Sequence, residues 1–169
     1  MFSRNFIFLN TKMYCMKKEI KPFQLAEKSI KKNLILATKL DDKVNIMTLG
    51  WKTIGTLWSK PVWIVAVKPS RFTYDMINKS KDFTLHLFSK ERSDVVDLSG
   101  MASGRNTDKI KELGLTLKKS NKVNTPLIEE AEISYECRII HTAESGNNAE
   151  HRLYFGHILA AYAEEGLLN

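Results

Sequence analysis

Two segments of the chain place cations, hydroxyls and backbone N–H groups where a helix is expected to begin. The donors are Ser70, Arg71 and Thr73 in the first segment, and Ser103, Gly104, Arg105 and Lys109 in the second. A helix N-terminus carries partial positive charge and N–H groups without helical partners, so both segments suit a phosphate. We expect Arg105 and Lys109 to share a face, because they are four residues apart. A plain helix cap with a solvated arginine explains the first segment equally well.

A third segment, residues 44–51, runs from a strand into a glycine and an aromatic residue. Its candidate contacts with a ligand are Asn45, Met47, Thr48, Leu49, Gly50 and Trp51. Gly50 would let the backbone approach a planar ligand closely, and Leu49 and Trp51 would cover one side of it. On spacing alone, a strand that ends in a turn with a core tryptophan is the favoured interpretation.

Among the histidines, His151 is the candidate for catalysis, because it lies between the polar loop 145–148 and a strand. Such a histidine can donate a hydrogen bond or carry a proton, although a solvent-exposed histidine without a role is the more frequent case. No nucleophile–base pair has a local signature. Cys15 and Cys137 give neither a disulfide framework nor the spacing of a zinc site, so no metal is expected.

Short apolar runs rich in β-branched residues predict strands. The runs are 34–38, 44–48, 62–67, 83–87, 133–140 and 153–161. Residues 62–67 are continuously apolar, which predicts a strand buried on both faces. Residues 83–87 alternate, which predicts a half-buried strand. Strands therefore dominate, and the expected fold is mainly β with short helices, a barrel or sandwich in a single domain.

Three short helices are expected between these strands. Ser70 would cap a helix through residue 78, and Ser93 would cap residues 94–98. Asn106 or Thr107 would cap residues 108–113, and Gly114 suits the C′ position after them. We expect residues 1–19 to be a flexible N-terminal extension, with 1–15 dispensable, and residues 20–169 to form the domain.

The net charge of +7 is concentrated in the N-terminal fifth of the chain. Residues 1–33 carry eight Lys or Arg and two Glu, so the rest of the chain is close to neutral. A near-neutral body argues against nucleic acid as a partner. No apolar run approaches the roughly 18 residues of a membrane span. Two cysteines fit a reducing compartment, so we expect a cytoplasmic protein with no membrane partner.

The order of these segments over residues 20–162 resembles the flavin reductase-like family, which has an FMN-binding split β-barrel fold. The segments that carry the resemblance are, in chain order, residues 45–48, Pro61 with its strand, residues 69–73, Phe83, residues 103–105 with 108–109, Pro126, residues 132–137, and His151 before a strand that contains Gly156. Within the family, the chain is most similar to the flavoredoxin branch. It departs from the family pattern at 149–150, where Gly-Asp is common before the histidine, and at Ser99, where cysteine is common.

The resemblance implies a homodimer with FMN near the subunit interface. It implies that residues 45–51 line the isoalloxazine and ribityl chain. It also implies that Ser70, Arg71, Thr73 and Lys109 hold the phosphate, with residues 103–105 beside it. His151 would act near the nicotinamide or the flavin edge. Because Arg71 directly follows the expected helix cap, we expect its removal to weaken FMN binding more than removal of Lys109.

Three functions are compatible with the sequence. The leading hypothesis is an NAD(P)H-dependent oxidoreductase that passes electrons from NADH or NADPH through bound FMN to an unknown redox acceptor. The alternative is a non-enzymatic carrier of the flavoredoxin type with tightly bound FMN, and NADH oxidation by the pure protein separates the two. The third is a flavin-free module that binds another anion or nucleic acid, which the colour of the purified protein would test.

Overall fold

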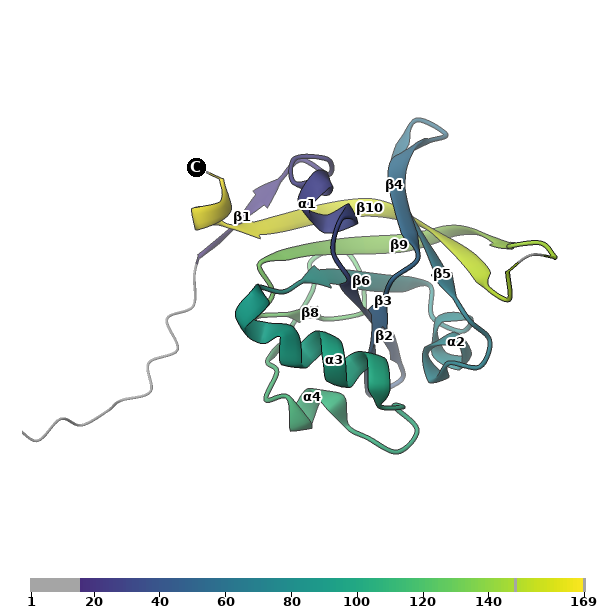
Figure 1. The fold of residues 1–169 in the computed structure, drawn as a ribbon. Helices are drawn as coiled ribbons and strands as arrows, with labels where there is room; N and C mark the ends of the chain where they lie inside the picture. Colours follow the sequence, from purple (N-terminus) through teal and green to yellow (C-terminus); the bar gives the residue numbers. More distant parts are fainter. Residues whose placement is uncertain (1–15, 148, 169) are drawn as a thin grey trace, which may run out of the picture.

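The computed structural model of the protein describes residues 16–147 and 149–168 (Figure 1). The strands are β1 (Lys17–Ile20), β2 (Leu34–Leu40), β3 (Lys43–Leu49), β4 (Lys52–Leu57), β5 (Lys60–Val67), β6 (Asp82–Leu87), β7 (Leu117–Lys118), β8 (Leu127–Ile128), β9 (Ile133–Glu144) and β10 (Arg152–Glu164). The helices are α1 (Ala26–Ile30), α2 (Phe72–Ile77), α3 (Ser93–Met101) and α4 (Lys109–Glu112), with 3-10 turns η1 (Lys90–Arg92) and η2 (Glu165–Leu167). The chain is mainly β with short helices, as expected.

Eight of these strands form one antiparallel sheet in the order β3-β2-β6-β9-β10-β5-β4, with β1 paired to β10, and β7 and β8 form a separate two-stranded antiparallel sheet. The sheet curves but does not close, so β3 and β4 are left as edges of a split β-barrel. β9 and β10 form its long central hairpin, with register shifts that let these strands bend. In Figure 1, α3 and α4 lie below the sheet, and α2 lies near the end of β5.

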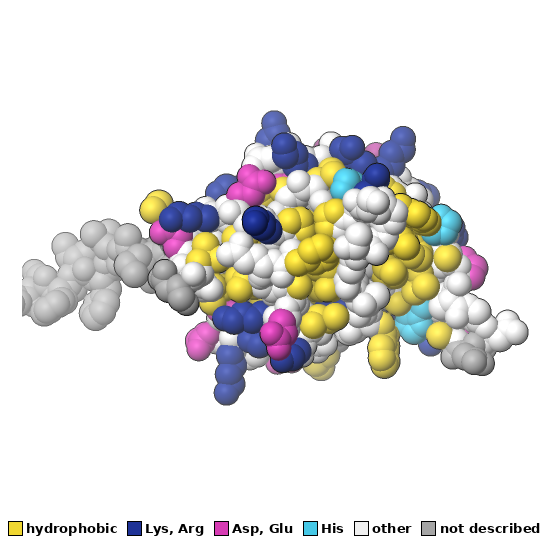
Figure 2. Space-filling view, turned by 90° about the horizontal axis from the view of Figure 1, so that it is seen from above, with side chains coloured by type: hydrophobic (Ala, Val, Ile, Leu, Met, Phe, Trp, Pro, Cys, Tyr) yellow, Lys and Arg dark blue, Asp and Glu magenta, His cyan; other side chains and the backbone are white. Residues whose placement is uncertain are grey.

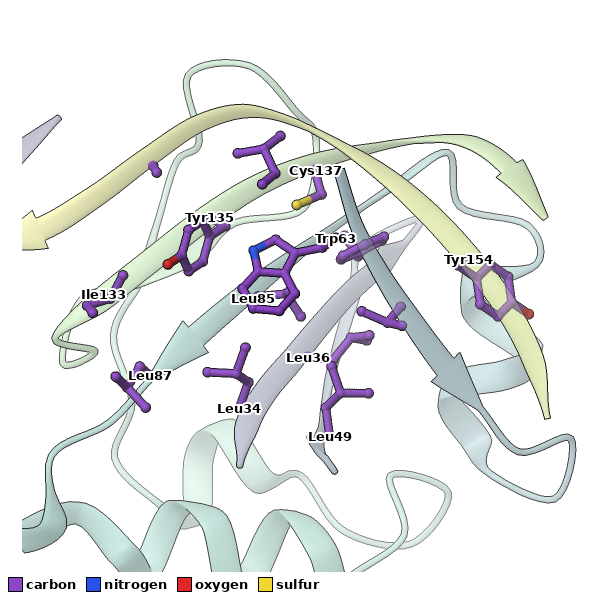
Figure 3. Close-up of a cluster of buried hydrophobic side chains, with 14 of the residues drawn as sticks. Leu34, Leu36, Leu49, Trp63, Leu85, Leu87, Ile133, Tyr135, Cys137 and Tyr154 are labelled. Atoms are coloured by element: carbon purple, nitrogen blue, oxygen red, sulfur yellow. The ribbon is translucent and has the colours of Figure 1, made fainter. Parts of the chain in front are cut away.

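The main core fills the concave side of the sheet (Figure 3). The ring of Trp63 meets that of Tyr135 edge to face, with centroids 5.4 Å apart, and both side chains are fully buried. Leucines from β2, β3 and β6 surround them, at positions 34, 36, 49, 85 and 87. Burying each such side chain contributes roughly 1.5–3 kcal/mol relative to exposure. This core fixes β3 and β5, the two strands that carry site residues.

A smaller apolar cluster lies between the sheet and α3. It contains Ile35, Ala37 and Ile46 from the sheet, and Val95 from α3. These residues lie on the opposite face of β2 and β3 from the main core, as the twofold alternation of strand side chains requires. The cluster therefore holds α3 against β3, and the C-terminal end of α3 reaches the candidate site.

The expectations for two strands were wrong about burial. β6 was expected to be half buried, but all six of its residues are buried. Residues 115–131 cover its second face, where Thr84 Oγ1 donates to the Pro126 carbonyl at 2.9 Å. β5 was expected to be buried on both faces, but Ile64 and Ala66 are only half buried. The second face of β5 lies on the outer side of the sheet, so the apolar residues on that face are not part of the core.

The structure corrects all three expected helix starts, and at α3 the N-cap is Arg92, because Ser93 is already the first residue of the helix. Arg71, not Ser70, is the N-cap of α2, and no side chain caps that helix. α3 extends over Ser93–Met101, beyond the expected residues 94–98. At α4 the N-cap is Asp108, whose carboxylate accepts from the Lys111 N–H at 3.2 Å. Gly114 has φ of +58° immediately after the C-cap of α4, which confirms its expected C′ position.

β4 and β1 were not predicted. β4 is an edge strand with little buried surface, so its residues lack a clear apolar pattern. It joins β5 through Trp58 and Ser59, whose positive φ values suit a tight hairpin turn without the usual glycine. β1 places residues 17–19 in the sheet, paired with β10, rather than in an N-terminal extension. Residues 1–15 lie outside the described residues. Among the described residues, no helix is long and apolar enough to cross a membrane.

Candidate functional site

One cavity of about 470 Å³ brings together every residue that the sequence nominated for the site. These residues are Asn45, Met47, Thr48, Leu49, Gly50, Trp51, Ser70, Arg71, Thr73, Ser103, Gly104, Arg105, Lys109 and His151. They come from β3, the start of α2, the segment between α3 and α4, and the residue before β10. Residues far apart in the sequence therefore line one cavity, and their contact with a ligand stays a prediction.

The floor of the cavity is a close contact between β3, α2 and the segment 102–108. The buried Asn45 side chain donates from Nδ2 to Thr73 Oγ1 at 2.8 Å. A Cβ added at Gly104 would lie 2.0 Å from Asn45 Oδ1 and 2.8 Å from the Phe72 ring. Only glycine permits this approach. Gly104 is therefore needed for protein packing, a reason that the sequence did not reveal.

Gly50 and Trp51 stand at the other end of the cavity. A Cβ added at Gly50 would meet only Asn33 Oδ1 at 3.8 Å, so no protein packing requires glycine there. Trp51 is 72% exposed and lines the cavity, which excludes the simpler interpretation of a core tryptophan. Met101, at 87% exposed, lines the same cavity. This end is open and apolar, and it suits a planar ring.

The opposite end of the cavity is positively charged. Lys68, Arg71, Arg105 and Lys109 line it, and no carboxylate among the described residues does so. Lys68 pairs with Glu150 at 2.8 Å, and Arg105 pairs with Asp75. Arg71 and Lys109 have no ion-pair partner among residues 16–147 and 149–168.

Lys109 is the unusual cation of this group, because it is only 4% exposed. Its Nζ donates to the Ala102 carbonyl at 3.2 Å, its one hydrogen-bond partner among the described residues. Burial, and then the nearby positive charge of Arg71, lower the pKa of Lys109 to about 8. A buried ammonium next to a guanidinium is costly without a counter-ion. The arrangement is therefore built for an anion that the protein does not itself supply.

Arg105 has a different place from the one expected. It precedes α4, so it does not share a helix face with Lys109. Its guanidinium pairs with Asp75 at 2.7 Å and donates to the Ser70 carbonyl at 3.4 Å. It also lies over the Phe72 ring, 5.4 Å from the centroid. Arg105 thus ties the segment before α4 to the start of α2 and positions the cavity wall.

His151 lies half buried at the rim of the cavity, and its backbone is fixed by the β9–β10 turn. Its N–H donates to Ser145 Oγ at 3.2 Å, and that hydroxyl donates to the His151 carbonyl at 2.6 Å. The ion pair between Glu150 and Lys68 braces the same turn against the end of β5. The His151 ring makes no hydrogen bond to a described residue, so it is available to a ligand.

His86, by contrast, is structural. Its ring is fully buried between Thr84 Oγ1 at 2.9 Å and Ser134 Oγ at 3.2 Å. Burial, with a smaller effect from the positive charge of Lys17, lowers the pKa of His86 to about 3. The imidazole therefore stays neutral at physiological pH.

Several cavity residues were missed by the sequence analysis. They are Ala66, Lys68, Phe72, Ser99, Gly100, Met101 and Ala102. The Ser99 hydroxyl is buried and has no hydrogen-bond partner among the described residues, which makes it a candidate donor to a ligand. No local pattern marks Ser99, because only the packing of α3 against β3 brings it to the cavity.

Comparisons with known proteins agree with this architecture. A family model described as "Flavin reductase like domain" matches residues 30–169. An uncharacterized protein of Archaeoglobus fulgidus is 33% identical over 70% of this chain, and the match spans 64% of that protein. The chain thus spans slightly less than two thirds of that relative's length.

Two solved structures are similar to the whole arrangement. Flavoredoxin of Desulfovibrio vulgaris (Miyazaki F) has a TM-score of 0.71 and 27% identity, covering 79% of this chain and 70% of that one. An FMN-binding protein from Thermus thermophilus, solved with bound 1-cyclohex-2-enone, has a TM-score of 0.71 and 26% identity, covering 81% and 72%. Since the family match covers most of the chain and the split barrel is shared, this chain belongs to the flavin reductase-like domain family.

Proposed function

We propose that the cavity binds FMN. The observation that carries the proposal is the uncompensated positive end of the cavity, where buried Lys109 and unpaired Arg71 stand with no carboxylate beside them. A phosphate dianion supplies the missing charge and accepts charge-assisted hydrogen bonds from both. The open apolar end at Trp51 suits the isoalloxazine, and Asn45 and Thr48 of β3 also line the cavity.

Bound flavin supplies reversible electron transfer, and the residues of this chain hold and orient it. Arg71 and Lys109 would anchor the phosphate, with Thr73 and Ser103 as further donors. Arg105 would act indirectly, because its ion pair with Asp75 holds in place the segment that carries these donors. His151, the tentative catalytic residue, would offer a proton or hydrogen bond at the rim.

We propose that the protein is an oxidoreductase that takes electrons from NADH or NADPH and passes them through FMN to a downstream acceptor. The open rim beside His151 supports this, because it leaves room for a second reactant. A non-enzymatic carrier is the second candidate, and the similarity to flavoredoxin favours it.

The test is the absorbance spectrum of the purified protein, followed by anaerobic additions of NADH and of NADPH. Absorbance bands of oxidised flavin that bleach with either nucleotide support the oxidoreductase. Flavin bands that bleach only with a chemical reductant support the carrier. A colourless protein that takes up no FMN would refute both.

We further propose a homodimer through the outer face of the sheet. Trp58 is 59% exposed there and packs against His141 and Phe155, with ring centroids 5.7 and 6.4 Å away. Ile64 and Ile140 add apolar surface. Figure 2 views the molecule from above and presents hydrophobic side chains over the middle of this side, with Lys and Arg along the rims. Such a patch is typical of a subunit interface.

Sedimentation at micromolar concentration should give twice the 19.4 kDa chain mass. The Trp58→Asp variant should sediment as a monomer, and Leu117→Asp serves as a control, because Leu117 of β7 is also an exposed apolar residue but lies outside the flavin cavity. A monomeric wild-type protein that still holds FMN would contradict the proposed dimer while leaving the flavin site in place.

A further inference from the structure

A second hollow, of about 580 Å³, lies between β6, β9 and the segment 119–124 that connects β7 to β8. It shares no lining residue with the flavin cavity. Four exposed cations line it, namely Lys81, Lys119, Lys122 and Arg138. We call this hollow the basic groove. Four cations around one hollow are notable in a chain whose net charge after residue 33 is close to zero.

Two buried carboxylates, Asp82 in the lining of the groove and Glu136 beside it, accept hydrogen bonds from the segment 119–124 and its neighbour Thr125. Asp82 is buried and accepts from the N–H groups of residues 124 and 125, both at 3.0 Å. Glu136 is fully buried and accepts from the N–H groups of residues 121 and 122, at 3.1 and 2.6 Å. The Thr125 and Tyr162 hydroxyls also donate to Asp82 and Glu136, at 2.6 and 3.0 Å. These bonds fix the segment rigidly but do not neutralise the cations.

The four cations are nevertheless left without a direct ion pair. None of them forms an ion pair with a described residue. Arg138 donates one hydrogen bond, from Nη2 to the Lys122 carbonyl at 3.3 Å, which leaves the rest of its guanidinium free. The groove thus carries a concentrated positive potential on a rigid support.

The lining indicates what kind of anion fits. Among residues 16–147 and 149–168, no aromatic side chain lines the groove, so these residues do not offer the stacking surface that single-stranded nucleic acid uses. Half-buried Val123 and Ile139 add an apolar strip between the cations. We propose that the basic groove docks an acidic segment of another protein, with carboxylates on the four cations and an apolar side chain on the strip. This proposal is independent of flavin binding.

The test uses the full chain and a fluorescein-labelled peptide of glutamates interrupted by leucine, followed by fluorescence anisotropy in 20 mM NaCl. We expect saturable binding that is largely lost in 200 mM NaCl, because exposed charges are screened over about 10 Å or less at such ionic strength. The double variant Lys119→Glu/Lys122→Glu should weaken binding by about tenfold or more, and the milder Lys119→Gln/Lys122→Gln by less.

The matched control is Lys28→Glu/Lys32→Glu, which makes the same charge change on two exposed residues, one within α1 and one just after it. It should change peptide affinity less than about twofold. Any of four results would overturn the proposal: no peptide binding by the wild-type chain, an equal loss in the control variant, tighter binding of a twelve-residue oligothymidylate than of the peptide, or a changed oligomeric state in the groove variants. The last result would make the groove a contact between copies of this chain.

Discussion

Replacing Lys109 by methionine should separate FMN from riboflavin, because only FMN carries a phosphate. The structure places the ammonium at 4% exposure beside Arg71, so its interaction with a phosphate is poorly screened. A lost charge-assisted hydrogen bond costs about 1.5–3 kcal/mol, which is about tenfold to a hundredfold in affinity. Arg71→Ala should act in the same direction but more weakly, since Arg71 is exposed. From the sequence, the loss of Arg71 was expected to have the larger effect. The structure reverses this order because Lys109 is buried, which the sequence does not reveal.

Affinities are measured by flavin fluorescence quenching, with FMN and riboflavin titrated into each variant. Riboflavin affinity should change less than about threefold in either variant, since the two ligands share every interaction except that with the phosphate. The flavin-free Lys109→Met variant should also melt no lower than wild type, because it removes a buried charge whose lowered pKa reflects up to about 3 kcal/mol of unfavourable burial. If riboflavin affinity falls as far as FMN affinity, or if the variant loses stability, Lys109 serves the fold and the phosphate assignment is wrong.

Three further predictions follow from particular residues. FMN affinity should fall about tenfold between pH 7 and pH 9, because Lys109, with a pKa of about 8, must be protonated to bind the phosphate. An FMN affinity that does not change over this pH range would rule out contact between the ammonium and the phosphate. In the Lys109→Met variant, FMN affinity should not depend on pH over this range. Gly104→Ala should cost about 1–3 kcal/mol of stability in thermal melts and weaken FMN binding, since its Cβ would overlap Asn45; Gly55→Ala, with no atom within 4 Å of its Cβ, should leave both unchanged. Acidification from pH 7 to pH 5 should lower the free energy of unfolding by about 2 kcal/mol through His86, because the unfolded chain takes up a proton near pH 6.5 that the folded chain takes up only near pH 3. Urea unfolding at the two pH values measures this loss. The His86→Gln variant should not show this part of the loss.

The sequence predicted most strands and the residues of the candidate site. The apolar runs of β2, β3, β5, β6, β9 and β10 are local patterns, and each became a strand. Helix starts near residues 70 and 108 are also local, because capping and turn preferences depend on a few neighbouring residues. The order of these segments along the chain carries the resemblance to a family with the split-barrel fold.

The tertiary structure alone decided how the site residues are used. Lys109 and Arg105 look equivalent in the sequence, yet packing buries one beside Arg71 and pairs the other with Asp75. Trp51 looked like a core residue, but β3 ends at the open mouth of the cavity and leaves it exposed. Burial and ion pairing depend on contacts between segments far apart in the chain, and local propensity carries no information about them. The sequence by itself therefore determined which residues gather, and the fold determined which of them are left without a partner and thus free to bind an anion.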